Sequence, residues 1–499
     1  MSANEKTAAR GSTPSAQPVC LCPLWLCSCS PFSRCLARKA GMDPQRTLPI
    51  PVTATAIYVK IKSGSEAMTT IGTDIDRGTS ALEQALADAP FYERWRACDP
   101  GPSVSLAKRM AALPVLTKRD LRAHIPHGFI QHGHDAKAGF ASGEIEMVST
   151  SGTAEERVSV VWNQAWWDRS EQEAARLHPV LHRVFGSAHR EAVLTTPLCA
   201  GNLCHVGEVP LQERIVGNVL FLNQALDPTS WDERNIRRMA EELGLFQPEV
   251  IEADPAYLAI LARACLMAGH ALHQPGCIVL TYEFPSHLHY RQIHRAFPGV
   301  PVISSYGSTE TGHVFTQCEA GAFHQNTATC HVDIQPLRAN HGEPTVGRIL
   351  VTTLDNPWSM LLRFDVGDLA RIRQNPPCPC GRTDGFTLDA IEGRSRDVTF
   401  DTAGHEVTVK RLDDALGAAD GLVSYRVEQT EPLHYAMRYA AEPEAERHTA
   451  DILPNILHAV YGDKAEIEVS PDSALPPEQS GKFRLARTAW KVSSGDLFG

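Results

Sequence analysis

Hydroxyl side chains and a glycine gather in the segment VSTSGTAEERVSV, residues 148–160. Thr150, Ser151, Gly152 and Thr153 offer hydroxyls and backbone N–H groups, which are the groups that wrap a phosphate. Such a segment can bind a phosphate, although the same composition is typical of an ordinary turn. No Gly-Lys-Ser/Thr element follows a strand here, so the sequence disfavours the P-loop of kinases and GTPases.

Four more glycine-centred segments follow along the chain: SSYGSTETG (304–312), LLRFDVGDLARI (361–372), IEGRSRDV (391–398) and SGKFRLAR (480–487). Each segment alone is typical of an ordinary turn. The set in this order, with its flanking sequence, resembles the adenylate-forming superfamily of acyl-CoA ligases, and its phenylacetate–CoA ligase branch in particular.

Three further stretches carry this resemblance. The stretch ALADAPFYERW…LPVLTKRDLRAHIP is similar to the opening of that branch, YGSTE matches an aromatic-Gly-x-Ser/Thr-Glu motif, and CPCGR stands just before GRSRD. The resemblance runs from about residue 80 to residue 490. It implies ATP-dependent activation of a carboxylic acid, with an aromatic acid expected, to an acyl-adenylate, followed by transfer to coenzyme A.

Two alternatives stay open at this stage. The acyl group could pass to an amine or to a carrier-protein thiol, or the chain could be a degenerate relative that binds nucleotide without catalysis. The resemblance implies three partners: a small-molecule acid, ATP and coenzyme A. It leaves open whether the protein forms a homodimer.

The resemblance also assigns roles to individual residues. Lys482 carries the charge that meets the acyl and phosphate oxygens during adenylation, and Glu310 is a ligand for Mg²⁺, which favours carboxylate and phosphate oxygens. The residues expected to bind the nucleotide and acyl groups are Thr150, Ser151, Gly152, Thr153, Glu283, Tyr306, Gly307, Ser308, Thr309, Asp368 and Arg394.

The sequence departs from the superfamily pattern at two places. Glu155 stands where a second glycine is usual, and with Glu156 it adds negative charge near a polyphosphate, while Arg157 compensates in part. Arg396 stands in GRSRD, where the family more often has Asp at the hinge of the small domain. Glu155 and Glu156 are expected to weaken binding of pyrophosphate. Arg396 is expected to affect how the small domain rotates between the two steps.

The cysteines define a second candidate site. Cys318 and His324 lie in one loop, and Cys378 and Cys380 flank a proline, which together make a Cys₃His set of the kind that holds structural zinc. Cys330 and His331 lie close in sequence and could replace one ligand. We expect this site to stabilise the fold, with no part in the reaction.

Helices and β-rich runs alternate between residues 190 and 355, which predicts an α/β fold with a substantially parallel sheet. Together with the resemblance, this gives a large adenylate-forming N-terminal domain with mixed or parallel sheets, residues 76–394. A small mobile α+β C-terminal domain follows, residues 395–499. We expect Thr79 to cap the first helix and Pro90 to end it, with further caps at Thr117 and Asp254.

The bulk composition narrows the function classes. The 499 residues carry a net charge of −11, which gives no support for nucleic-acid binding, and no apolar run is long enough to span a bilayer. The 14 cysteines in so long a chain favour a reduced, cytoplasmic protein over a secreted disulfide scaffold. Residues 1–75 are expected to be a disordered extension, with Met42 or Met68 as alternative starts, so residues 1–67 should be dispensable.

Overall fold

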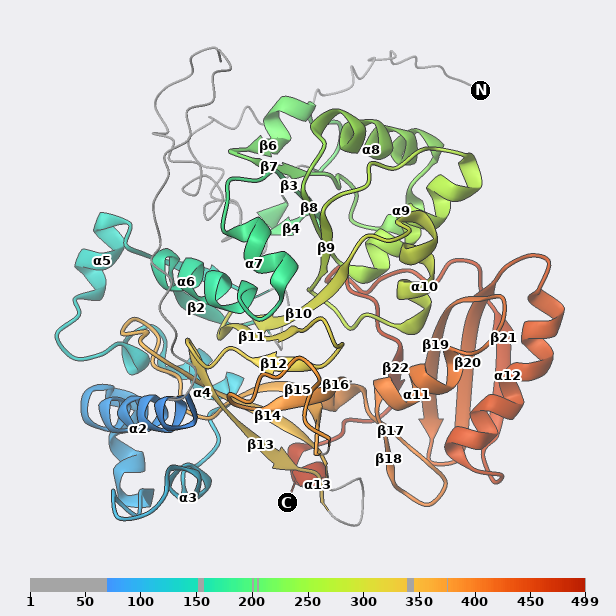
Figure 1. Cartoon of the computed structure of the whole chain (residues 1–499). Helices are drawn as coiled ribbons and strands as arrows, with labels where there is room; N and C mark the ends of the chain where they lie inside the picture. Colours follow the sequence, from blue (N-terminus) through green and yellow to red (C-terminus); the bar gives the residue numbers. More distant parts are fainter. Residues whose placement is uncertain are drawn as a thin grey trace, which may run out of the picture.

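The computed structural model describes residues 70–150, 157–199, 202–203, 206–338, 345–374 and 376–498 (Figure 1). Within these ranges, no helix combines the length and the apolar character that a membrane crossing requires. The predicted extension at residues 1–75 lies largely outside them.

The α-helices of the described residues fall into two parts of the chain, residues 70–296 and residues 409–498. The α-helices are α2 (Thr70–Asp88), α3 (Leu106–Ala112), α4 (Lys118–His124), α5 (Ala136–Ser142), α6 (Gln164–Ala175), α7 (Pro179–Phe185), α8 (Glu233–Phe246), α9 (Pro255–Ala268), α10 (His287–Ala296), α11 (Val409–Leu416), α12 (Glu446–Tyr461) and α13 (Ser494–Phe498). Short 3₁₀ helices are η1 (Pro90–Cys98), η2 (His127–Phe129), η3 (Leu211–Arg214), η4 (Pro228–Ser230) and η5 (Ser395–Asp397).

The strands before residue 395 are β1 (Ile145–Ser149), β2 (Ser159–Asn163), β3 (Glu191–Leu194), β4 (Leu198–Cys199), β5 (Asn202–Leu203), β6 (Ile215–Val216), β7 (Val219–Phe221), β8 (Val250–Ala253), β9 (Cys277–Leu280), β10 (Val302–Ser308), β11 (Gly312–Gln317), β12 (Phe323–Gln325), β13 (Cys330–Pro336), β14 (Val346–Thr353), β15 (Phe364–Ile372) and β16 (Thr387–Arg394). The strands after it are β17 (Thr399–Phe400), β18 (Glu406–Val407), β19 (Leu422–Glu431), β20 (His434–Ala441), β21 (Glu466–Pro471) and β22 (Ala486–Thr488).

A mixed sheet dominates the larger part of the molecule. Its strand order is β13-β14-β15-β16-β12-β11-β10-β9-β8-β3-β7-β6. From β10 to β7 neighbouring strands are parallel, whereas from β13 to β10 they are antiparallel. The predicted α/β fold with mixed sheets is confirmed, and β10, which carries the YGS residues, joins the two halves.

The parallel strands are buried on both faces, as their apolar sequences require. Strands β8 and β9 are buried at every position. On one face they pack with α8, α9 and α10 in one hydrophobic core, and on the other face with α6 and α7 in a second core. In Figure 1 these helices flank the upper, green part of the sheet. This packing leaves the carboxyl ends of the strands as the edge where a ligand can bind.

Local capping signals were read correctly at two helices and wrongly at one. Thr117 forms a capping box with Asp120 at α4, and Asp254 accepts hydrogen bonds from two N–H groups of α9, whose first residue is Pro255. The predicted cap at Thr79 is wrong, because α2 already begins at residue 70. The Thr79 hydroxyl donates to the carbonyl of Ile75 one turn earlier, at 2.7 Å, so it lies inside the helix.

The C-terminal part has a sheet and a core of its own. Strands β21-β20-β19-β22 form a four-stranded sheet, and α11 and α12 pack with it in a separate hydrophobic cluster. In Figure 1 these elements carry the labels β19, β20, β21, β22, α11 and α12 and lie at the right of the molecule. This part contains both helices and strands, while the division at residue 395 stays a prediction.

Candidate active site

The carboxyl end of β10 forms one wall of the site. Pairing with β11 shifts register between Tyr306 and Gly307. A Cβ atom at Gly307 would lie 2.3 Å from the Gly312 carbonyl oxygen, so only glycine fits there. The Ser308 hydroxyl lies 2.9 Å from that of Thr311, which closes the turn after the strand.

Tyr306, Asp368 and Arg394 come together from three strands. Asp368 and Arg394 are opposite each other in the β15–β16 register, and Arg394 Nε lies 3.8 Å from Asp368 Oδ1. The Tyr306 hydroxyl donates to Asp368 Oδ2 at 2.9 Å. Burial, followed by the nearby Asp368 charge, raises the pKa of Tyr306 well above its ordinary value, so the phenol stays a donor. The group therefore offers a fixed aromatic ring beside a carboxylate that has further acceptor capacity.

Lys482 enters the site from the C-terminal part of the chain. Its Nζ donates to the Tyr282 carbonyl oxygen at 2.9 Å. The next residue, Phe483, donates its backbone N–H to Glu283 Oε1 at 2.7 Å. These two hydrogen bonds join the segment around residue 482 to the turn that follows β9, which lies far from it in the sequence.

The glycine before Lys482 is required by close packing. Gly481 has a φ of +79°, and a Cβ atom there would lie 2.4 Å from the Thr196 hydroxyl. Its carbonyl oxygen accepts a hydrogen bond from the Tyr257 hydroxyl at 2.9 Å. The Ser-Gly-Lys sequence thus lets the backbone approach the body closely enough for the lysine to enter.

The ionisable groups around Lys482 shift one another's pKa values. Burial, then the Asp254 charge, raises the pKa of Glu283 well above its ordinary value. Burial raises the pKa of Asp254 to about 7, against the effect of Lys482. Burial and then Arg394 lower the pKa of Lys482, while the surrounding carboxylates act in the opposite direction. Such mutually perturbed groups in a concave site are typical of functional sites.

Glu310 is suited to a hard cation. It is 5% exposed, and Lys118 Nζ lies 3.7 Å from its Oε1. That oxygen accepts no hydrogen bond within the described ranges, and a buried carboxylate oxygen without a donor is unfavourable. Mg²⁺ binds through one or two carboxylates together with substrate phosphates, so the donor fits this ion.

The predicted phosphate loop is described only at its edges. Thr150 lies at its start, where its hydroxyl accepts the Val158 N–H at 3.0 Å. Ser151, Gly152 and Thr153, with Glu155 and Glu156, lie outside the described residues. Arg157, at the other edge, is exposed.

One cavity gathers every predicted nucleotide, acyl or catalytic residue that the structure describes. Its volume is about 460 Å³, in the usual range for small-molecule sites. The predicted residues that line it are Thr150, Glu283, Tyr306, Gly307, Ser308, Thr309, Glu310, Asp368, Arg394 and Lys482.

The expected hinge at Arg396 is tied to the segment that carries Lys482. Arg484 donates to Asp397 Oδ1 at 2.6 Å and to the Arg396 carbonyl oxygen at 3.2 Å. Arg396 Nε lies 3.6 Å from the same Asp397 oxygen. One carboxylate therefore contacts two guanidinium groups, one from the expected hinge and one from the segment that carries Lys482.

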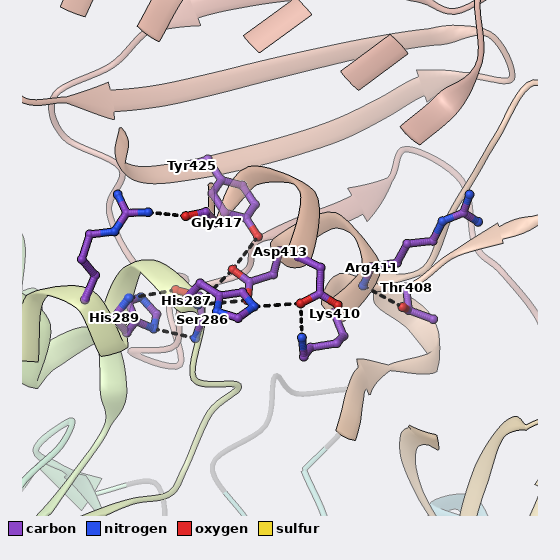
Figure 2. A network of polar contacts seen from close by, with 11 residues as sticks. Ser286, His287, His289, Thr408, Lys410, Arg411, Asp413, Gly417 and Tyr425 are labelled. Atoms are coloured by element: carbon purple, nitrogen blue, oxygen red, sulfur yellow. Dashed lines mark hydrogen bonds and ion pairs between the residues drawn. The ribbon is translucent and has the colours of Figure 1, made fainter. Parts of the chain in front are cut away.

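A second contact between the two parts lies on helix α10 (Figure 2). The backbone N–H of His287 donates to Asp413 Oδ2 at 3.0 Å, and its ring Nε2 lies 2.7 Å from Asp414 Oδ1. Lys410 also pairs with Asp414, and Arg291 donates to two backbone carbonyls that follow α11. His287 and Arg291 thus join α10 to the C-terminal part in the same structure in which Lys482 lines the cavity.

The structure brings together the Cys₃His set predicted from sequence, and none of its four members is among the residues that line this cavity. The ligand atoms of Cys318, His324, Cys378 and Cys380 all lie within 4.8 Å of one another. Cys318 Sγ is 3.6 Å from Cys378 Sγ, and Cys380 Sγ is 3.2 Å from His324 Nε2.

The alternative ligand Cys330 is not part of this group. Its thiol donates to the Asn326 carbonyl oxygen at 3.4 Å, and it and His331 belong to β13. Within the described ranges, the group of potential metal ligands is the Cys₃His set alone.

Sequence analysis missed three residues of the cavity region. Tyr282 and Glu252 line the cavity, and Asp254 perturbs both Glu283 and Lys482. Asp254 was recognised only as a helix cap. A signal did exist for it, because a capping carboxylate at the end of a parallel strand lies at the edge where ligands bind.

No protein-family model matches the sequence, and no curated protein matches it either. Solved structures do resemble it in fold. One is 2-hydroxyisobutyryl-CoA ligase in the postadenylation state in complex with R3-HIB-AMP, with a TM-score of 0.62 and 17% identity over 84% of this chain and 89% of that one. The same ligase in an open conformation, with 2-HIB-AMP and CoA, gives a TM-score of 0.53 at 19% identity over 85% and 90% of the two chains. The same ligase in the thioesterification state, with 2-HIB-AMP and CoA, gives a TM-score of 0.50 at 19% identity over 80% of this chain and 86% of that one.

Proposed function

We propose that this chain, which has the fold of adenylate-forming CoA ligases, activates a carboxylic acid with ATP and transfers the acyl group to coenzyme A. One observation carries the proposal. Lys482 reaches from the C-terminal part into the cavity that Tyr306, Asp368 and Arg394 also line. A cation, an aromatic ring and a carboxylate thus face one space.

In the first step, a carboxylate oxygen of the acid attacks the α-phosphorus of ATP, and the bond to pyrophosphate breaks. Negative charge moves from the acid to the leaving group during this step. Lys482, held by the Tyr282 carbonyl, is positioned to stabilise that charge without reorganising. Asp368 accepts hydrogen bonds from the ribose hydroxyls, and the Tyr306 ring packs against the base.

Glu310 would hold Mg²⁺, which neutralises charge on the phosphates when bound. Lys118 lies beside Glu310 and adds a second positive charge at the same end of the cavity. The loop of residues 150–157 would supply N–H groups and hydroxyls for the pyrophosphate.

In the second step, the thiol sulfur of coenzyme A attacks the acyl carbon and AMP leaves. We propose that residues 395–499 form a small mobile domain that moves between the two steps, about the segment at Arg396. Two observations support assigning the present orientation to the first step. Lys482 lies in the cavity, and the TM-score is higher against the postadenylation state of the similar ligase than against its other two states.

The phenylacetate–CoA ligase branch, and with it an aromatic acid, remains part of this proposal. The stretches that resemble this branch contribute to the fold. Phe91 and Tyr92 are buried in the largest core, and Thr117 caps α4, whose first residue is Lys118. The CPCGR segment contributes two members of the Cys₃His set.

We further propose that the Cys₃His set binds a structural zinc ion. With Zn–S near 2.3 Å and Zn–N near 2.0 Å, tetrahedral ligands are about 3.5–3.8 Å apart. The contacts of 3.6 Å between two sulfurs and 3.2 Å between sulfur and nitrogen are close to that spacing. The other ring nitrogen of His324 faces the Thr387 hydroxyl at 3.4 Å, which can orient the ring.

The proposed function is tested by acid-dependent release of pyrophosphate. The purified protein is given ATP, Mg²⁺ and a panel of aromatic and aliphatic acids, with and without coenzyme A. Pyrophosphate release that requires an acid, and AMP with thioester only when coenzyme A is present, supports the proposal. Acid-dependent pyrophosphate release without thioester would assign the acyl group to another acceptor, and no release with any acid would overturn adenylation.

A further inference from the structure

Tyr257 contacts both of the residues that flank Lys482. Its hydroxyl donates to the Gly481 carbonyl oxygen at 2.9 Å. Its ring meets the Phe483 ring edge to face, with 6.1 Å between the two ring centroids. Tyr257 is not among the residues that line the cavity, so an effect of this side chain on the reaction would pass through the lysine.

Tyr257 is itself held firmly by the body of the protein. It is fully buried in the first turn of α9, whose N-terminus is capped by Asp254. The Thr196 side chain hydrogen-bonds to its phenol. Burial, followed by the Asp254 charge, raises the pKa of Tyr257 well above its ordinary value, so the phenol remains a donor. A side chain fixed by packing and hydrogen bonds can in turn fix what it contacts.

The segment that carries Lys482 is a tight turn. The Gly481 N–H donates to the Glu478 carbonyl oxygen at 2.8 Å, and the Glu478 N–H donates to the Lys482 carbonyl oxygen at 2.8 Å. Because these two bonds close the turn around the lysine, a contact that fixes the Gly481 backbone also fixes the position from which the Lys482 side chain starts.

The contact between Tyr257 and Gly481 can be exchanged for one within the body. The Leu226 carbonyl oxygen lies 3.3 Å from the same hydroxyl, farther than that of Gly481. A phenol has one hydrogen to donate, so it bonds well to one of these two acceptors at a time. If the C-terminal part moves, the hydroxyl retains an acceptor at Leu226, and the phenol is not left buried without a partner.

We propose that Tyr257 is a positioning residue for adenylation, whose phenol holds Gly481 and thereby places the Lys482 ammonium in the cavity. The inference rests on the proposed function, in which Lys482 stabilises the charge that moves in the first step. Tyr257→Phe keeps the ring and its contact with Phe483 but removes the hydrogen bond to Gly481. The lysine is then still present, but its backbone is held less firmly.

The first test measures the rate of one turnover of adenylation in the whole protein. Benzoate, phenylacetate and hexanoate are each mixed with ATP and Mg²⁺ without coenzyme A, and pyrophosphate is followed by rapid quench with the acid that the wild type uses fastest. Tyr257→Phe should lower the rate by about tenfold and change the half-saturating ATP concentration by less than about twofold, because displacement of a catalytic group affects the transition state more than binding.

A double-mutant cycle shows whether Tyr257 acts through the lysine. In the Lys482→Ala background, Tyr257→Phe should change the rate by less than about twofold, because no ammonium remains to be positioned. A purely structural role would give losses that multiply, since the two substitutions would then act independently.

A second test needs no acid. Each protein is treated briefly with acetic anhydride, and acetylation of Lys482 and of the exposed Lys491 is compared by mass spectrometry. The Lys482 amine of the wild type donates to the Tyr282 carbonyl oxygen, which protects it. Loss of one hydrogen bond should make the segment open more often, so Tyr257→Phe should raise Lys482 acetylation by about fivefold and leave that of Lys491 unchanged.

Tyr92→Phe is the matched control. Tyr92 is fully buried, and its hydroxyl donates to the Met360 carbonyl oxygen at 2.9 Å in a different core. This variant should lower the thermal unfolding midpoint about as much as Tyr257→Phe, with a wild-type rate and wild-type labelling of Lys482.

The outcomes separate this inference from the proposed function. A wild-type rate in Tyr257→Phe, losses that multiply in the double variant, or equal slowing by Tyr92→Phe overturns the inference and leaves the proposed function standing. Unchanged Lys482 acetylation in Tyr257→Phe also overturns the inference, whatever acids the protein uses. No pyrophosphate release with any acid overturns the proposed function and, with it, the role of Tyr257 in adenylation.

Discussion

The cavity around Lys482 and the Cys₃His cluster are both built from segments far apart in the sequence, yet their groups relate in opposite ways. In the cluster, four ligand atoms point at one another within 4.8 Å, and one ion would satisfy them all. At the cavity, Glu283 is a lining residue and the buried Asp254 lies near it, and the pKa of both carboxyl groups is raised. The Lys482 charge acts against the raised pKa of both groups.

The difference is what we expect if the cluster stabilises the fold and the cavity carries out the proposed reaction. A closed ligand set gains its free energy on folding, because it is complete once metal is bound. Buried groups that oppose one another reduce stability, and they persist where a ligand or a moving charge will meet them. Substitutions should therefore affect rate in the cavity and stability in the cluster.

The largest effect is expected from Lys482→Ala. Loss of a preorganised charge at the reacting oxygens should lower acid-dependent pyrophosphate release by about 100- to 1000-fold, or about 3–4 kcal/mol. The thermal unfolding midpoint should change little. Lys491→Ala, an exposed lysine in the same terminal segment, is the control. A wild-type rate in Lys482→Ala would mean that Lys482 is not the catalytic lysine.

The cluster should show the reverse pattern. Elemental analysis of protein prepared without chelator is expected to give about one zinc per chain. Replacing Cys378 and Cys380 together with Ser should lower the unfolding midpoint by about 5 °C or more, since structural zinc contributes directly to folding, while the rate below that midpoint changes less than about threefold. Cys98→Ser, an exposed thiol, is the matched control. Absence of zinc with an unchanged midpoint would contradict the site.

A smaller effect should appear in the pH dependence of stability. Burial raises the pKa of Asp254 from 3.8 to about 7, so the folded protein keeps a proton that the unfolded chain releases. The stability that this proton contributes is present below pH 4 and is lost as pH rises through about 7. Asp254→Asn keeps the helix cap but cannot titrate. The unfolding midpoint of the variant, relative to wild type, should therefore rise between pH 4 and pH 7, and a constant difference would contradict the assignment.

The smallest effect is expected at the contact between α10 and α11. The His287 and Asp414 side chains are 49% and 53% exposed, so their pair is screened by salt and contributes little. Asp414→Asn should change pyrophosphate release by less than about threefold, with a larger change at low ionic strength. Asp451→Asn, exposed on α12, is the control. An effect as large as that of Lys482→Ala would show that this contact controls access of the lysine to the cavity.

Much of the fold could be predicted because its signals are local. The cap at Thr117 and the Asp254-Pro255 start of α9 depend on neighbouring residues only, and both were found. The cap at Thr79 failed for a related reason. A hydroxyl can bond back to the preceding turn as readily as it can cap, and the sequence around it does not distinguish the two.

The candidate site was predicted wherever a short motif carried it. Tyr306, Asp368, Arg394 and Lys482 were assigned from the motifs around them, and the structure brings all four to one cavity. Glu252 belongs to a strand with no such motif. Its position in the cavity could be recognised only from its neighbours across the sheet.

The sequence by itself predicted many of the elements and the four members of the Cys₃His set, with Cys330 and His331 as alternatives for one of them, because propensity, capping and ligand chemistry act over a few residues. The tertiary structure alone decided which groups meet. The raised pKa of Asp254, the φ of +73° at Tyr282 and the approach of Lys482 to the turn after β9 all depend on burial by distant segments. Desolvation and packing are properties of the folded chain, so no local pattern encodes them.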